Sequence, residues 1–356
     1  MNTKPRKIIK KNQLPFRKKV SSKSKKTFIL FIIGIIAIVL IIPTSIVLPF
    51  IKKDTLPSES NASPSNEKAE EMNSDYMVAV KRASTDTVEN LPLETYVVGV
   101  VASEMPIEFE MEALKAQAVA ARTYVVNHLL HESKDKTITD TVQHQVYKND
   151  EELRQLWGKD YEDKMNRLME AVQATQGQVI LHGETPITPA FFSTSNGFTE
   201  NSEDYWGSEL PYLRSVESPW DKNSPKFLDQ KTFSLTEIED HLQITLPREE
   251  AVAVDITRTD SERVKELTLQ DHTFSGREIR EKLGLRSNDF SIKQRNDHLI
   301  FTTKGYGHGI GMSQYGANEL AKQGKTYEDI IHYYYKDVQM KPVNHFAPTL
   351  VRASEN

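Results

Sequence analysis

A glutamate ends an apolar run in the segment YVVGVVASEMP, residues 96–106. The residue before a proline avoids the helical region, so a helix is expected to end before Pro106 with Glu104 in its last turn. The negative end of the helix dipole and apolar neighbours such as Met105 both raise the pKa of a carboxyl group placed there. A glutamate that stays protonated near neutral pH can serve as a general acid. A surface glutamate without such a role is the alternative.

A second segment, FFSTSNGFTENSEDYW at residues 191–206, places a polar turn after a predicted strand end. The side chains expected to bind a polar substrate are Ser193, Ser195, Asn196, Thr199 and Tyr205. An ordinary β-turn is the alternative, because Asn-Gly is the commonest hairpin signal. A serine nucleophile is disfavoured, since the G-x-S-x-G elbow is absent.

A third segment, GYGHGIGMSQYG at residues 305–316, is rich in glycine. It matches neither the G-x-G-x-x-G fingerprint nor the phosphate-binding P-loop, so nucleotide binding is disfavoured. Its glycines allow a ligand to approach the backbone closely, beside the side chains of His308, Ser313 and Gln314. A purely structural turn is the alternative.

No metal or other cofactor is expected. His128 and His131 share a predicted helix and His144 follows later, but there is no H-E-x-x-H motif. The chain has no cysteine, which excludes disulfides, thiolate zinc sites and thiol nucleophiles. Arg122 is expected to pair with a buried carboxylate and to have a structural role.

The elements that must position these segments alternate irregularly between helix and strand, which predicts an α+β fold with two lobes at residues 76–351. Strands are expected at 76–81, 179–181, 190–193, 252–258, 264–269 and 299–303. Helices are expected from 93 to Pro106, at 111–132 and 164–175, after Ser234, after a Ser275-x-x-Glu278 capping box, up to Gln323 and after Thr326. The stretch at about 226–297 is expected to be an inserted lobe.

An uncharged apolar run at residues 27–51 is long enough to cross a bilayer. Every charged residue in the tail at 1–26 is basic, so the positive-inside rule puts this tail in the cytoplasm. A cleaved signal peptide is the alternative, but no small-x-small cleavage site follows the run. Residues 52–75 are rich in Ser, Asn, Pro and Glu and are expected to form a disordered linker. The catalytic domain would then lie outside the cytoplasm.

The charge balance bears on possible partners. The chain has 45 Lys and Arg against 50 Asp and Glu, and 11 of the basic residues belong to the N-terminal tail. The remaining 34 basic residues leave the rest of the chain distinctly acidic. Nucleic acid is therefore not an expected partner, because its binding depends on neutralising phosphates.

Together the three segments resemble the SpoIID/LytB family. The matching residues are LETYVVGVVASEMP followed by EALKAQAVAARTY, then FFSTSNGFTENSEDYWG, and then GYGHGIGMSQYGA. The resemblance spans nearly the whole globular region. It implies a lytic transglycosylase that cuts peptide-free peptidoglycan strands between MurNAc and GlcNAc and leaves 1,6-anhydro-MurNAc ends. Glu104 matches the family's catalytic acid.

The resemblance also implies a setting and partners: the septal and engulfing membrane of a sporulating bacterium, the amidase SpoIIP and the membrane protein SpoIIM. Some relatives carry cysteines and hold zinc near the segment TDTVQHQVY at 139–147, and this chain lacks them. Two other functions remain open. One is a non-catalytic glycan-binding activator of a cell-wall amidase, and the other is a hydrolase that adds Glu108 or Glu110 as a second acid.

Overall fold

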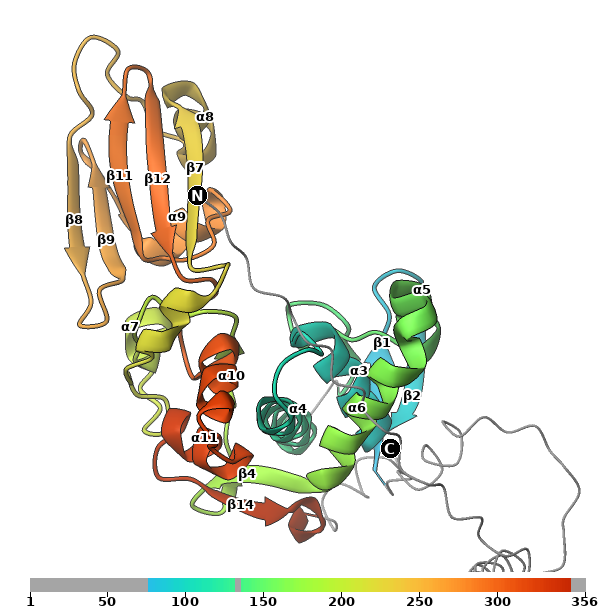
Figure 1. The fold of residues 1–356 in the computed structure, drawn as a ribbon. Helices are drawn as coiled ribbons and strands as arrows, with labels where there is room; N and C mark the ends of the chain where they lie inside the picture. Colours follow the sequence, from blue (N-terminus) through green and yellow to red (C-terminus); the bar gives the residue numbers. More distant parts are fainter. Residues whose placement is uncertain (1–75, 132–135, 347–356) are drawn as a thin grey trace, which may run out of the picture. The chain divides into compact units, whose positions relative to one another are not determined.

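The computed structural model describes residues 76–131 and 136–346, and helices and strands follow one another irregularly along them (Figure 1). The expected mixed α+β fold is therefore confirmed. The tail at 1–26, the anchor at 27–51 and the linker at 52–75 lie outside the described residues. Among the helices that are described, none is long and apolar enough to cross a membrane.

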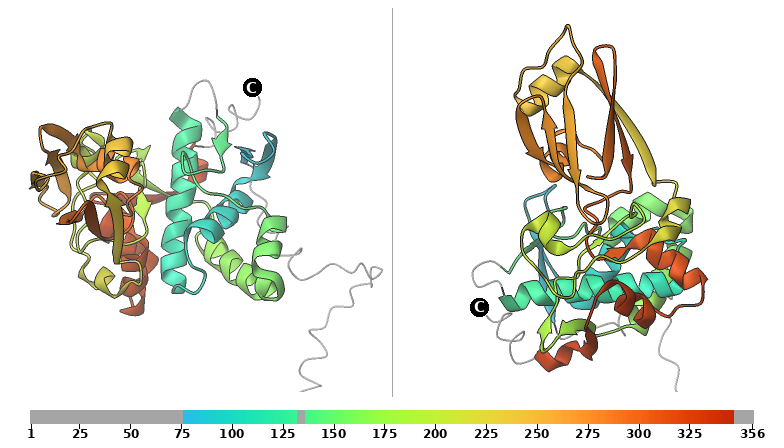
Figure 2. Two further views of the ribbon diagram at one scale, coloured as in Figure 1. Left: turned by 90° about the horizontal axis from the view of Figure 1, so that it is seen from above. Right: turned by 90° about the vertical axis from the view of Figure 1, so that its left-hand side faces the viewer.

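Helix α4 (Met111–His131) forms the centre of the larger hydrophobic core. Figures 1 and 2 show this teal helix between α3 and α6 on one side and α10 and α11 on the other. Small side chains let these neighbours approach from all around, and the fully buried ones are Ala113, Ala116, Ala118, Ala120 and Ala121. A helix that is apolar on every side is typical of a buried one. Two of the neighbours that enclose it, α10 and α11, come from the far end of the chain.

The other helices outside the second lobe are shorter than α4, and several begin at a clear capping residue. They are α3 (Leu93–Glu104), α5 (Asp150–Trp157), α6 (Tyr161–Ala174), α7 (Ser202–Trp206), α10 (Gln314–Lys322) and α11 (Tyr327–Tyr334). Side-chain caps account for several starts: Asn149 opens α5 and Thr326 opens α11 with reciprocal capping boxes. The expected helices at 93 to Pro106, 111–132 and after Thr326 are confirmed, whereas α5 was not predicted.

Three small sheets border this core. β1 (Met77–Lys81) pairs with β2 (Val88–Pro92) and β3 (Ile138–Thr139), and β4 (Gln178–His182) pairs with β5 (Thr185–Pro186) and β14 (Gln339–Pro342). In the third, β6 (Phe191–Phe192) runs parallel to β13 (Met312–Ser313). This last pairing joins the polar segment and the glycine-rich segment, which lie more than a hundred residues apart in sequence.

A second hydrophobic core is built from the elements between β7 and β12, coloured yellow to orange in Figure 1. They are β7 (Leu228–Ser234), α8 (Leu235–Leu242), β8 (Val254–Arg258), β9 (Val264–Leu269), β10 (His272–Ser275), α9 (Gly276–Lys282), β11 (Phe290–Arg295) and β12 (His298–Lys304). Two three-stranded sheets result, in the orders β11-β12-β7 and β10-β9-β8. Because β7 and β12 pair along their whole length, the chain enters and leaves this lobe at neighbouring points.

A buried ion pair ties several elements of the main core together. Arg122 on α4 donates three hydrogen bonds to the Glu94 carboxylate on α3, at 2.9, 3.2 and 2.6 Å. Arg122 also donates to the Gln178 carbonyl, and Glu94 accepts from the Gly177 backbone N–H. Both side chains are buried, so the expected pairing of Arg122 with a buried carboxylate is confirmed.

Removal of one partner of this pair should be strongly destabilising. Arg122→Met or Glu94→Leu leaves a buried charge uncompensated, and each should lower the free energy of unfolding by about 3–5 kcal/mol. The double variant should cost less than the sum, since no charge is then left alone. Urea unfolding of the full-length chain measures this. The matched control is Arg277→Ala in the exposed Arg277–Glu281 pair, with an expected cost of at most about 1 kcal/mol. If the loss of unfolding free energy in the double variant equalled the sum of the two single losses, Arg122 and Glu94 would not be coupled as described.

Candidate active site

Glu104 is the last residue of α3, and Met105 after it adopts an extended conformation that ends the helix. Its carboxylate is half-buried, and Oε1 accepts a hydrogen bond of 3.1 Å from the Val146 backbone N–H. Burial raises the pKa of Glu104, and the Val146 hydrogen bond opposes this rise. No cation among the described residues forms an ion pair with it. The raised pKa expected from the sequence thus has burial as its main cause.

The loop that carries Val146 is held against α3 by close packing. Tyr147 stacks on Tyr96 with ring centroids 5.5 Å apart, and the Tyr96 hydroxyl donates to the Gln145 side chain. Gly99 makes this approach possible, because a Cβ atom there would lie 2.5 Å from the Lys148 carbonyl oxygen and closer still to the Tyr147 ring. The position of the Glu104 carboxylate thus depends on a glycine one turn and a half earlier in the same helix.

A cleft of about 500 Å³ opens beside Glu104. All three segments singled out in the sequence contribute to its lining, together with the loop around Val146. The lining residues are Glu104, Tyr124, Val142, Gln143, His144, Gln145, Val146, Thr188, Pro189, Ala190, Phe191, Phe192, Ser193, Trp206, Lys226, Tyr306, Gly307, His308 and Gln314. Of the predicted site residues, the cleft brings together Glu104, Ser193, His308 and Gln314. Among these lining residues, Glu104 is the only carboxylate and Lys226 the only lysine or arginine.

His308 lies at the centre of an aromatic cluster at the cleft. Its ring is 5.7 Å from Phe192 and 6.1 Å from both Tyr205 and Trp206, measured between centroids. Burial lowers the pKa of His308 to about 3, assisted by the positive charges of Arg280 and Arg263. The neutral ring accepts a hydrogen bond from the Ile310 backbone N–H at Nδ1. His308 therefore lines the cleft as an uncharged polar ring.

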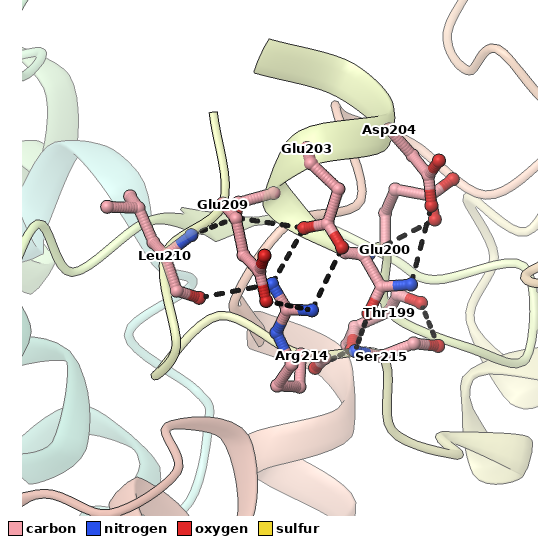
Figure 3. Close-up of polar contacts among 10 residues, drawn as sticks. Thr199, Glu200, Glu203, Asp204, Glu209, Leu210, Arg214 and Ser215 are labelled. Carbon is pink, nitrogen blue, oxygen red and sulfur yellow. Dashed lines mark hydrogen bonds and ion pairs between the residues drawn. The ribbon is translucent and has the colours of Figure 1, made fainter. Parts of the chain in front are cut away.

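Helix α7 carries Tyr205 and Trp206, and Arg214 holds it in place through Glu203 on the same helix. Figure 3 shows the Arg214 guanidinium donating to both oxygens of Glu203, at 2.9 and 2.7 Å, with Glu209 as a further ion-pair partner. The Arg280 guanidinium donates to the Tyr205 hydroxyl. Tyr205 thus contacts the cluster around His308, although it does not line the cleft itself.

Ser195 and Ser313 are buried behind the cleft, where both donate to Asp221. The distances are 2.6 Å from Ser195 and 2.8 Å from Ser313, and Ser218 donates to the same carboxylate at 2.6 Å. Burial raises the pKa of Asp221 to about 6, against the effect of the three hydroxyl donors. These two predicted site residues therefore hold the walls of the cleft in place.

Asn196 and Thr199 are also buried and make hydrogen bonds within the protein. The Asn196 amide donates to the Ser261 carbonyl and to Asp289 in the second lobe. Thr199 donates to the Arg214 carbonyl and accepts from the Val216 backbone N–H. Their contacts position the polar segment and do not reach the cleft.

The glycines of the third segment serve packing within the protein. A Cβ atom at Gly309 would lie 2.5 Å from the buried Arg263 guanidinium, and one at Gly311 would collide with the Ala190 carbonyl. Both have positive φ angles, +89° and +77°, which also favour glycine. The sequence suggested that these glycines admit a ligand, but at these two positions the protein's own atoms occupy the space.

Metal-ligating side chains do not gather in the parts of the chain that the structure describes, where no group of three or more His, Asp or Glu could hold an ion. The rings of His128 and His144 pack edge to face with centroids 5.1 Å apart.

Comparisons with known proteins show the family of this chain. The family model described as SpoIID, stage II sporulation protein, matches residues 81–182. The stage II sporulation protein D of Bacillus subtilis is 44% identical over 334 residues, which cover 90% of this chain and 97% of that protein. This chain belongs to the SpoIID family. The corresponding protein of Bacillus amyloliquefaciens is 43% identical over 337 residues, with the same coverage. An amidase enhancer of Bacillus subtilis is 29% identical over 291 residues, 67% of this chain and 39% of that protein.

Some residues of this SpoIID-family site gave no signal in the sequence. Asp221 and Lys226 lie in the short stretch SPWDKNSPK, which has neither periodicity nor a motif. Val146 contributes only its backbone N–H, so its residue type says nothing of its role. Trp206 was noticed only as the end of the polar segment, and its exposed ring carried no indication of a cleft.

Gly99→Ala should destabilise the protein, whereas the same change in most helices stabilises. Gly→Ala in a helix interior normally stabilises by up to about 1 kcal/mol. Here the new methyl group collides with Tyr147 and the Lys148 carbonyl, so Gly99→Ala should lower the free energy of unfolding by about 1–3 kcal/mol. Urea unfolding measures this, and a stabilised variant would show that the loop can move away at little cost.

The raised pKa of Asp221 predicts a pH-dependent stability. The folded protein holds this proton up to pH of about 6, whereas the unfolded chain releases it near the ordinary value of 3.8. Stability should therefore fall as pH rises from about 4 to about 6, by up to about 3 kcal/mol at about 1.4 kcal/mol per pKa unit. Asp221→Asn should remove this slope, and the exposed Asp255→Asn should leave it unchanged. If the stabilities of the wild type and of Asp221→Asn changed with pH in parallel, the slope could not be due to Asp221.

Proposed function

We propose that this chain is a lytic transglycosylase that cuts peptide-free peptidoglycan strands between MurNAc and GlcNAc and forms 1,6-anhydro-MurNAc ends. One observation carries the proposal. Glu104, with a raised pKa, is the only carboxylate among the described residues that line the cleft. A lytic reaction needs only one such group, because the sugar supplies its own nucleophile.

Glu104 would perform two proton transfers. Its carboxyl group first donates a proton to the bridging oxygen as the bond from that oxygen to MurNAc C1 breaks, and GlcNAc leaves with a free 4-hydroxyl. The resulting carboxylate then takes the proton of the MurNAc C6 hydroxyl as O6 bonds to C1. The 1,6-anhydro ring closes, Glu104 is protonated again, and no water is consumed. A raised pKa suits the first step, and the single hydrogen bond from Val146 leaves the group able to change charge.

The arrangement of the other acids supports this reaction over hydrolysis. Retaining and inverting glycosidases typically use two carboxylates that flank the bond. Glu108, one suggested second acid, is exposed and forms an ion pair with Lys164 at 3.6 Å. Glu110, the other, is also exposed, and neither residue lines the cleft.

The cleft has the surface that a glycan requires. Val142, Trp206 and Tyr306 are exposed apolar side chains at the cleft. The aromatic faces of Trp206 and Tyr306 are of the kind that packs against sugar rings. Ser193, Gln143 and Gln314 add polar side chains to the lining, which suits a ligand rich in hydroxyl and N-acetyl groups.

The proposed setting is the septal or engulfing membrane of a sporulating cell. A single anchor at residues 27–51 would hold the N terminus in the cytoplasm and the catalytic domain outside. The proposed partners are the amidase SpoIIP and the membrane protein SpoIIM. An amidase fits the proposed substrate, since glycan strands become peptide-free only after their stem peptides are removed.

A non-catalytic activator of a cell-wall amidase is the second candidate, favoured by the similarity to the amidase enhancer of Bacillus subtilis. Such a protein would bind glycan in the same cleft without cutting it.

Product analysis with the full-length chain tests these functions. Peptide-free glycan strands should yield anhydro-MurNAc ends, and Glu104→Gln should reduce the rate by at least about 10²-fold because the acid is lost. The matched control Glu108→Gln should retain the rate. Burial raises the pKa of Glu104 above the ordinary value of 4.5. The rate should therefore decline as the pH rises past this raised pKa and Glu104 loses its proton.

Other outcomes point elsewhere. Reducing MurNAc ends would indicate hydrolysis, and binding without cleavage would indicate an activator. Full activity of Glu104→Gln would show that this residue is not the acid.

A further inference from the structure

Lys226 is the only lysine or arginine among the described residues that line the cleft beside Glu104. It precedes β7, on the stretch that leads from the main core into the second lobe. Its position is fixed at the backbone, where the Lys226 N–H donates to Ser224 Oγ at 3.1 Å. Ser224 Oγ in turn contacts Thr194 Oγ1 at 3.0 Å, within the polar segment. The side chain therefore starts from a well-anchored point on the cleft wall.

Two aromatic rings hold the Lys226 ammonium group. Nζ lies 5.6 Å from the centroid of Tyr306 and 5.9 Å from that of Tyr315. Aromatic faces attract a cation without neutralising its charge. No carboxylate in the described part of the chain forms an ion pair with Lys226. The cleft wall thus presents an uncompensated positive charge in a chain that is otherwise acidic outside its N-terminal tail.

A neighbouring cation shows the contrast. Arg286 also lies over Tyr306, 5.5 Å from its centroid, but it pairs with Asp229 at 3.3 Å and does not line the cleft. Of the lysines and arginines in the described ranges 76–131 and 136–346, Lys226 alone lines the cleft and can meet an anion of the substrate there.

We propose that Lys226 determines substrate specificity by pairing with the free lactyl carboxylate of MurNAc. This inference rests on the proposed function, since it names what distinguishes the substrate of the same cleft. In peptide-bearing strands the lactyl carboxyl group is tied up in an amide and carries no charge. Once the stem peptide has been removed, it becomes a carboxylate. A polymer of GlcNAc alone lacks the group altogether.

A single cation can therefore distinguish the peptide-free strand from the other two glycans. It attracts peptide-free MurNAc, and it gains nothing from an amidated lactyl group or from a GlcNAc polymer. Partial enclosure by the two tyrosine rings strengthens the pairing relative to a fully exposed lysine, because less water screens it. Lys226 acts in binding and takes no part in the proton transfers.

Equilibrium binding to the full-length Glu104→Gln chain tests the proposal without cleavage. The probes are a peptide-free GlcNAc–MurNAc oligomer, the same oligomer with its lactyl carboxyl groups converted to primary amides, and a GlcNAc oligomer of equal length. Adding Lys226→Gln should weaken binding of the first probe about five- to tenfold and leave the other two unchanged. Lys226→Arg should retain most of the affinity. The matched control Lys293→Gln, at an exposed lysine on β11, should change none of them.

An equal loss for all three probes would mean that Lys226 only shapes the cleft, and no loss for the first probe would mean that it does not meet the carboxylate. Either result overturns the inference. These outcomes are separable from failure of the proposed function, which is decided by the products of the wild-type chain. A chain that cleaves glycans but shows no dependence on Lys226 refutes only the specificity, and one that discriminates through Lys226 without cleaving refutes only the chemistry.

Discussion

The Asp221 carboxylate accepts hydrogen bonds from three hydroxyl groups: Ser195 on the polar segment, Ser218 three residues before Asp221 in the chain, and Ser313 at the start of α10. Ser218 also contacts the hydroxyl of the buried Tyr334 on α11. Parallel pairing of β6 with β13 brings these segments side by side, and Asp221 fixes their separation. The walls of the cleft opposite Glu104 depend on this one buried group.

Three acids of the main core, Glu94, Asp221 and Glu104, differ in what surrounds their carboxyl groups. Glu94 is paired with the Arg122 guanidinium and serves the packing of the core. Asp221 is surrounded by neutral hydroxyl donors, so burial dominates and its pKa rises. Glu104 has the least support, a single backbone N–H, and it alone faces the cleft. The number of hydrogen-bond donors around the carboxyl group decreases from Asp221 to Glu104.

Much of the framework was predictable because its signals are local. Pro106 and the apolar run before it marked the end of α3, and the capping box at Ser275 marked the start of α9. The three segments that meet at the cleft were found from their own composition. Asp221 could not be found in this way, because its partners lie 26 and 92 residues away. Two-residue strands such as β13 likewise have no periodicity to detect.

Close approach within the protein explains why the positions of both Glu104 and the segment around β6 depend on glycine. Gly99 admits Tyr147 and the loop that carries the hydrogen bond to Glu104, while Gly311 admits the Ala190 carbonyl beside β6. In each case a backbone segment occupies the place of a side chain, and this brings polar backbone groups into an apolar setting where their hydrogen bonds are strong. A glycan held between these two walls would meet groups whose positions are set by packing and need little rearrangement on binding. In the proposed reaction, such pre-organisation would help a single carboxylate to serve as both acid and base.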